Sequence, residues 1–147
     1  KIIMSHVPDG VKIAQKNNLP KVVIDFIQTH HAESKARYFY NSYKNKYPEV
    51  EVDESVFTYT GPKPFSKEMV ILMMADAVEA ASRSLPEYTE KSIDNLVENI
   101  IDSQIAEGSF KNAPITFQQI EKVKRIFKRK LKNIYHSRIN YPELVKN

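Results

Sequence analysis

The segment from Ser66 to Arg83 reads SKEMVILMMADAVEAASR and decides the fold of the chain. Its apolar residues recur at helical spacing, at Val70, Met73, Met74, Ala77, Val78 and Ala81. Ser66 is suited to the N-cap, because its hydroxyl can accept a hydrogen bond from a backbone amide of the first turn. A single aspartate, Asp76, lies inside the apolar run. The pattern predicts a long helix with a buried face and a carboxylate on the flank of that face.

Three helices are predicted before this segment. Asp9 is expected to cap a first helix of about two turns that ends near Asn17. Pro20 fits the first turn of a second helix. The apolar stripe of this second helix is Val22, Val23, Phe26 and Ile27. A third helix is expected to end before Pro48, and its aromatic residues are Tyr38, Phe39 and Tyr43.

Two helices are predicted after it. Thr89 is expected to open one, and Gly108 to end it. Its apolar residues are Ile93, Leu96, Val97, Ile100, Ile101 and Ile105. Thr116 and Gln119 form a capping box at the start of the last helix. Its buried stripe is expected to comprise Ile120, Val123, Phe127, Leu131 and Ile134. With residues 49–64 interpreted as a loop, the sequence predicts one all-α domain, residues 1–147, of about six helices.

The composition excludes several classes of protein. The 147 residues include no cysteine, so a disulfide scaffold is excluded and any transition metal must be held by histidines and carboxylates. Only three glycines are present, and neither a P-loop nor a GxGxxG pattern occurs. The 41% of hydrophobic and 27% of charged residues are typical of a globular domain. No apolar run reaches the roughly 18 residues of a membrane span.

The positive charge of the chain is concentrated in one predicted helix. Within residues 122–132 there are seven cations and no acid: Lys122, Lys124, Arg125, Lys128, Arg129, Lys130 and Lys132. Removing these seven from the net charge of +4 leaves −3. Such a helix could bind nucleic-acid phosphates or an anionic membrane surface. Because the cations surround an apolar stripe, the pattern is also that of a solvated outer helix, and no specific nucleic-acid binding is expected.

Few residues have side chains suited to catalysis or to metal binding. The histidines are His6, His30, His31 and His136. At about 100° per residue, Asp76 and Arg83 lie on one helix face, and a carboxylate at the edge of a core needs a cationic partner. Taken singly, Asp76 fits a structural salt bridge and the adjacent histidines fit an incidental pair. Taken together, imidazoles and a carboxylate in a thiol-free chain are ligands suited to Mn²⁺, Fe²⁺ or Zn²⁺.

The order of short motifs is similar to that of a known family. The motifs are Ser5-His6-Val7, IDFI at 24–27, His30-His31, GPKP at 61–64, ILMMADAVEAA at 71–81, Arg83-Ser84-Leu85, IYHSRI at 134–139 and YPE at 141–143. Together they resemble the HD-domain phosphohydrolases, and more narrowly the cytosolic catalytic domain of seven-transmembrane bacterial HD proteins that hydrolyse cyclic di-AMP. The resemblance covers nearly the whole chain.

The resemblance implies a helical bundle with a binuclear metal site. One divalent metal, Mn or Fe, would be held by three histidines matching His6, His30 and His31, and the second partly by Asp76. Two such metals clamp a phosphate and activate water, so no catalytic residue beyond the metal ligands is expected. Lys63, Arg83 and Arg138 are candidates to bind the substrate phosphate. The implied parent is a bacterial inner-membrane protein with this domain at the cytoplasmic face, and the implied partner is a cyclic dinucleotide.

The chain departs from the family pattern in one respect. The adjacent His-Asp pair that names the family, and a further histidine, lie upstream of the residue matching His6, and no His-Asp dipeptide occurs in this chain. We therefore expect a C-terminal portion of the domain, truncated at its N-terminus, that binds at most one metal and is inactive alone. Missing helices predict an exposed apolar patch or self-association. His136 has no counterpart among the ligands and is interpreted as a structural or surface residue.

The absence of the His-Asp pair is also compatible with a different function. A non-catalytic HD-like sensor, which has lost its metals and serves as an interaction domain, would lack the same residues. Against this, His6, His30, His31 and Asp76 are all present. Truncation explains the missing pair more simply than decay of the site does.

Overall fold

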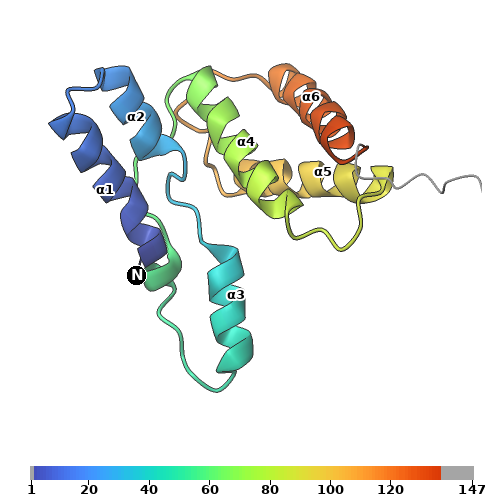
Figure 1. Ribbon diagram of the computed structural model, residues 1–147, viewed down its shortest axis with the longest axis horizontal. Coiled ribbons are helices and arrows are strands. Elements are labelled where there is room, and N and C mark those ends of the chain that lie inside the picture. The colour runs from blue at the N-terminus through green and yellow to red at the C-terminus, as the bar shows by residue number, and fades with distance from the viewer. Residues whose placement is uncertain (1, 137–147) are drawn as a thin grey trace, which may run out of the picture.

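The computed structural model describes residues 2–136, and these residues form six α-helices and no strand (Figure 1). The helices are α1 (Ile2–Lys16), α2 (Lys21–Thr29), α3 (Arg37–Lys46), α4 (Lys67–Ser82), α5 (Glu90–Ala106) and α6 (Phe117–His136). A short 3₁₀ helix, η1 (Glu54–Phe57), follows α3. The all-α class and the number of helices are therefore confirmed. No helix within residues 2–136 has the length and apolar character needed to cross a bilayer.

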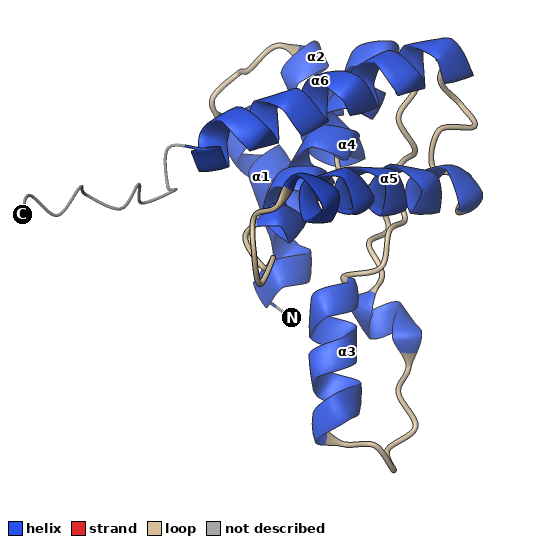
Figure 2. Ribbon diagram, turned by 90° about the vertical axis from the view of Figure 1, so that its right-hand side faces the viewer, coloured by secondary structure: helices blue, strands red, loops and turns tan. Residues whose placement is uncertain are grey.

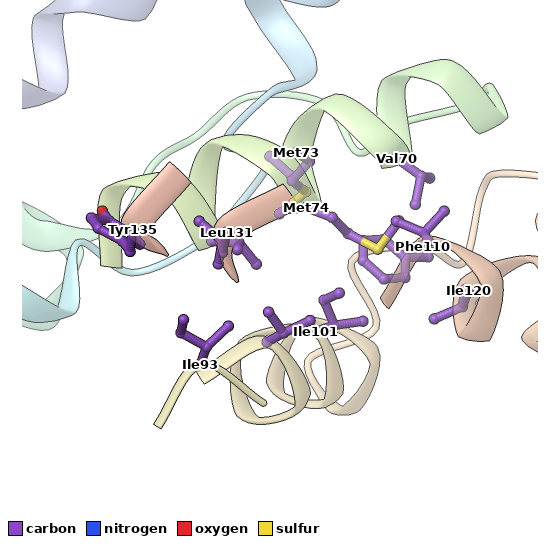
Figure 3. Close-up of a cluster of buried hydrophobic side chains, with 13 residues drawn as sticks. Val70, Met73, Met74, Ile93, Ile101, Phe110, Ile120, Leu131 and Tyr135 are labelled. Carbon is purple, nitrogen blue, oxygen red and sulfur yellow. The ribbon is translucent and has the colours of Figure 1, made fainter. Parts of the chain in front are cut away.

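The apolar face of α4 is the centre of the core. Val70, Met73 and Met74 are at most 1% exposed and pack against α5 and α6, as Figure 3 shows. From α5, Val97 and Ile101 are fully buried in the same cluster. Burying one side chain of this size contributes roughly 1.5–3 kcal/mol. The segment that predicted the fold therefore provides the surface on which the C-terminal helices assemble.

The helix ends are fixed by local hydrogen bonds. The Ser66 hydroxyl accepts from the Met69 amide at 3.2 Å, and Thr89 forms a reciprocal capping box with Ser92. Thr116 and Gln119 form the predicted box before α6. Gly108 follows α5 with φ +71°, a left-handed conformation that favours glycine. These predicted helix boundaries are confirmed.

The predicted start of the first helix was wrong. α1 is a continuous helix of 15 residues that contains Pro8, and Asp9 lies inside it, 3.8 Å from the Lys12 ammonium. Proline removes one helical hydrogen bond. The helix continues through it because its inner face packs on α2, with Ala14 only 1% exposed.

Two predicted stripes are only partly buried. Val22 and Val23 are 55% and 38% exposed, because α2 is contacted by α1 and α4 on its other faces. Ile134 is 56% exposed, because Leu131 and Tyr135 take the inward positions in the last turns of α6. Exposed apolar side chains therefore occur on α2, whereas an exposed apolar patch and self-association stay predictions.

The predicted loop at residues 49–64 contains η1 and part of a small extended layer. Lys35 and Thr58 form an antiparallel bridge, and the amides of Tyr59 and Gly61 donate to the carbonyls of Ser34 and Ala32 at 3.0 Å each. Together, α3 and η1 form an arm that extends away from the other helices (Figure 2). We call the segments 31–36 and 57–61 the two-stranded layer; they are paired by this one isolated bridge and by backbone hydrogen bonds and contain no regular strand. The layer joins the arm to the helical body.

Substitution Gly61→Ala is predicted to destabilise the chain. A Cβ at this position would lie 2.4 Å from the Gln28 carbonyl oxygen, so backbone must move. We expect a loss of about 2 kcal/mol in the free energy of unfolding, measured by urea denaturation. Gly10→Ala is the control, since its Cβ would meet only the Ile27 side chain at 3.2 Å; we expect a change within about 1 kcal/mol. Equal effects of the two substitutions would contradict the prediction.

Candidate metal centre

Three histidines, one from α1 and two from the residues that end α2, meet at one end of the α1–α2 pair. His6 lies on α1, His30 is the C-cap of α2, and His31 follows it directly. The Nε2 atoms of His6 and His30 are 3.2 Å apart, and one ring nitrogen from each of the three residues lies within 4.8 Å of the others. Packing of α1 on α2 thus brings together residues that are 24 positions apart in sequence.

The end of α2 orients the His30 ring. The His30 backbone amide donates to the Phe26 carbonyl, which holds the residue in helical geometry. Its ring Nδ1 lies 2.7 Å from the Ile27 carbonyl oxygen. A carbonyl can only accept, so this contact requires the proton on Nδ1 and leaves the Nε2 lone pair directed toward His6. This arrangement of a backbone carbonyl behind an imidazole is typical of histidine metal ligands.

His31 is held in its neutral form. Its burial, and then the neighbouring His30 and His6 rings, lower its pKa from 6.5 to about 3. The Asp76 carboxylate lies 3.7 Å from His31 Nδ1, beyond hydrogen-bonding length, and does not offset the burial. Neutral imidazole is the form that binds metals.

Tyr59 is a site residue that the sequence analysis missed. Its ring stacks on His31 with centroids 4.2 Å apart and an angle of 17°, and it meets His6 edge-on at 5.7 Å. The side chain is 8% exposed, and burial, followed by the charge of Asp76, raises its pKa. Tyr59 lies in the two-stranded layer, beside Gly61 of the GPKP motif. The alternation of FTYT at 57–60 was the only sequence signal that could have found it.

Asp76 lies beside the three histidines and not among them. Its side chain is 44% exposed on the flank of α4, as the helical periodicity predicted. Within the described residues, the group whose donor atoms all lie within 4.8 Å comprises the histidines alone. The carboxylate is therefore placed at the edge of the cluster, in contact with His31.

The predicted phosphate-binding residues lie in different places. The Lys63 ammonium is 3.2 Å from Glu33, two residues after His31. Arg83 is the C-cap of α4 and pairs with Glu79 at 2.8 Å, so the structure does not bring it to the histidines. Arg138 lies outside the described residues. His136 ends α6, and its side chain is likewise outside what the structure describes.

The donor set fits a divalent metal ion. Two nitrogens bound to one ion at about 2.1 Å each are at most roughly 4.2 Å apart. The pair His6–His30 already satisfies this limit at 3.2 Å. His31 also lines a groove of about 400 Å³ between α1 and residues 59–62, so the cluster is reached from solvent. A second ion would have fewer donors in the described residues, since Asp76 is the one carboxylate in contact with the cluster.

Comparison with known proteins confirms the resemblance. The cyclic-di-AMP phosphodiesterase PgpH of Bacillus subtilis (strain 168) is 39% identical over 145 residues, which is 99% of this chain and 20% of the relative. The protein of the same name from Listeria monocytogenes serotype 1/2a (strain 10403S) is 38% identical over 142 residues, 97% of this chain and 20% of that protein. The chain thus spans about a fifth of the length of these relatives. No family model matches the chain.

A solved structure confirms the fold. The crystal structure of the L. monocytogenes PgpH HD domain in complex with cyclic-di-AMP superposes with a TM-score of 0.82 at 38% identity. The match covers 95% of this chain and 65% of that chain. The chain is homologous to these phosphodiesterases and has the fold of their HD domain, a hydrolase family that uses divalent metals.

Tyr59→Ala is predicted to weaken metal binding, because the stacked ring holds His31 in the cluster. We expect the affinity for Co²⁺ to fall about tenfold, and Tyr59→Phe to bind as the unsubstituted chain does, measured by cobalt absorption titration. His30→Ala provides the reference for a lost ligand. Tyr59→Ala with unchanged affinity would show that the ring does not position His31.

The stability of the metal-free chain is predicted to fall on acidification. Between pH 6.5 and about 3 the unfolded chain protonates His31 and the folded chain does not, so stability is lost as the pH falls below 6.5. The midpoint of urea unfolding, measured with EDTA at pH 7 and at pH 5, should therefore decrease. In His31→Gln the decrease should be smaller. An identical decrease in both proteins would refute the assignment to His31.

Proposed function

We propose that this chain is part of a domain that hydrolyses cyclic di-AMP to the linear dinucleotide. The observation that carries the proposal is the three-histidine cluster, which lies on the fold that the PgpH HD domain has in its complex with cyclic-di-AMP. The proposal places residues 1–147 in the C-terminal portion of that domain, at the cytoplasmic face of a bacterial inner-membrane protein. The chain covers 65% of the matched solved domain, in agreement with a partial domain.

In this proposal the chain's own residues have distinct roles. His6, His30 and His31 hold one divalent ion, Mn²⁺ or Fe²⁺, with His30 Nε2 presented by the Ile27 carbonyl behind its ring. Asp76 provides a carboxylate toward a second ion. A divalent metal, when bound, supplies Lewis acidity toward the phosphodiester. Lys63, two residues after the end of the two-stranded layer, offers its ammonium to the substrate phosphate as a charge-assisted hydrogen-bond donor. Arg83 would need to leave Glu79 to contribute.

The basic helix gives less support to a nucleic-acid or membrane function. Three of its seven cations are held by acids. Lys124 contacts Glu98 and Asp102 at 2.7 Å each, Lys128 pairs with Glu98, and Lys132 lies 3.0 Å from Asp94. These contacts join α6 to α5 and give the cations a structural role.

The proposal predicts that hydrolysis requires more of the domain than this chain. With Mn²⁺ added, we expect the 147-residue chain to release no linear dinucleotide from cyclic di-AMP, measured by chromatography. A longer protein that spans the whole matched HD domain should turn it over. Within that longer protein, His31→Ala should lower turnover by about 100-fold or more, because a metal ligand is lost. Lys122→Ala, on the exposed side of α6, is the control.

Either of two results would contradict the proposal. One is a longer protein that binds Mn²⁺ and shows no turnover of cyclic di-AMP, which would favour the non-catalytic sensor. The other is equal turnover in His31→Ala and Lys122→Ala, which would move the reaction away from the histidine cluster.

A further inference from the structure

One buried residue beside the histidines has an unusual backbone conformation. Within residues 2–136, two residues other than glycine have a positive φ, Ala32 at +48° and Asn18 at +53°. The left-handed region is narrow for any residue with a Cβ, and asparagine is among the few side chains enriched there. Asn18 is exposed just after α1, where asparagine suits such a turn. Ala32 is 1% exposed and directly follows His31, so its conformation is imposed by its surroundings.

Backbone hydrogen bonds hold Ala32 in this conformation. Its amide donates to the Thr29 carbonyl at 3.1 Å. The Ser34 amide donates to the His31 carbonyl at 2.9 Å, so two successive turns overlap at residues 31 and 32. The Ala32 carbonyl accepts from the Gly61 amide at 3.0 Å. The chain therefore leaves the direction of α2 directly after His31 and enters the two-stranded layer.

The burial of Ala32 explains why the residue at this turn is small and apolar. Its side chain belongs to the buried cluster that is centred on α4. An asparagine at this position would bury an amide without an assured partner, which is costly. A β-branched residue would need more space and would disfavour the left-handed backbone. Alanine fills the buried position without a polar group and can still adopt the conformation.

The turn at Ala32 determines on which side of the layer the neighbouring side chains lie. His31 lines the groove beside α1 and belongs to the histidine cluster. Glu33 lines a separate open cleft of about 610 Å³ between the arm and the end of α5, on the other side of the layer. The turn also aligns Ser34 with Tyr59, whose amide donates to the Ser34 carbonyl and whose ring stacks on His31. A change of φ at residue 32 would thus move His31 relative to the other histidines and to Tyr59.

We infer that Ala32 is a positioning residue of the metal centre, because its left-handed turn directs the His31 imidazole toward His6 and His30. Ala32 acts through His31 and provides no ligand atom itself. The inference rests on the proposed function in one respect, which is that the histidines bind a divalent ion. It does not depend on the substrate on which that ion acts.

Binding of Co²⁺ to substituted chains tests the inference without any substrate. Ala32→Val should lower the affinity for Co²⁺ about tenfold or more, since valine disfavours the left-handed conformation and displaces His31. Ala32→Gly should bind Co²⁺ within about twofold of the unsubstituted chain, because glycine adopts this conformation readily. Affinities are measured by cobalt absorption titration, with His31→Ala as the reference for a lost ligand.

Asn18→Val is the matched control for the backbone effect. Asn18 has nearly the same φ as Ala32, and its amide likewise donates to the carbonyl three residues earlier, that of Gln15, at 3.1 Å. It lies between α1 and α2, at the other end of α2 from His30. Both valine substitutions should lower the midpoint of urea unfolding, but only Ala32→Val should lower the affinity for Co²⁺.

The outcomes separate this inference from the proposed function. Equal affinities of Ala32→Val and Asn18→Val, both folded by circular dichroism, overturn the inference even if cyclic di-AMP is hydrolysed. A tenfold loss in Ala32→Gly also overturns it, because the methyl group would then matter and the turn would not. If Ala32→Val does not fold, the glycine variant decides, and retained affinity supports the inference. Selective loss in Ala32→Val supports it even if no turnover is found, in which case the phosphodiesterase proposal fails alone.

Discussion

The burial of one face of α4 is the constraint on which the rest of the molecule depends. Val70, Met73, Met74 and Val78 must be removed from water, and α5 and α6 provide the surface that covers them. The opposite flank contacts α2, whose C-terminal end carries two of the histidines. Because Asp76 lies between the buried face and this flank, the packing that forms the core also places its carboxylate 3.7 Å from His31. The formation of the core and the position of Asp76 at the candidate site therefore both follow from the packing of α4.

Charge provides the second level of organisation. The Lys124 ammonium is 6% exposed between α5 and α6. Burial alone lowers its pKa, but hydrogen bonds to Asp102, Glu98 and Glu121 outweigh this effect and raise it. The ammonium thus stays charged at every physiological pH, and removing its partners would leave an unpaired buried charge. The strongly basic composition of α6 is in this way part of the contact that closes the core over α4.

What the sequence predicts well is what depends on neighbours along the chain. Ser66, Thr89 and Gly108 were found because caps and left-handed glycines act within one helical turn. The exposure of Val22 and Ile134 was not predicted, because an apolar stripe in the sequence does not show which of its edges a neighbouring helix covers. The histidine cluster was predicted from a family resemblance. Tyr59 was missed because its position beside His31 is set by backbone bonds from residues 59 and 61 to residues 34 and 32, which no local pattern contains.

The two-stranded layer explains why the histidine cluster and a separate cleft lie on two sides of the same segments in an all-α fold. A helix presents neighbouring residues around its axis, whereas an extended pair presents them alternately to two sides. Tyr59 and Thr58 are divided in this way between the histidines and the cleft. The close approach that permits the layer requires Gly61, since any Cβ there would meet the Gln28 carbonyl of α2. A single small residue thus sets the spacing between the helix end that carries His30 and His31 and the segment that separates the histidines from the cleft.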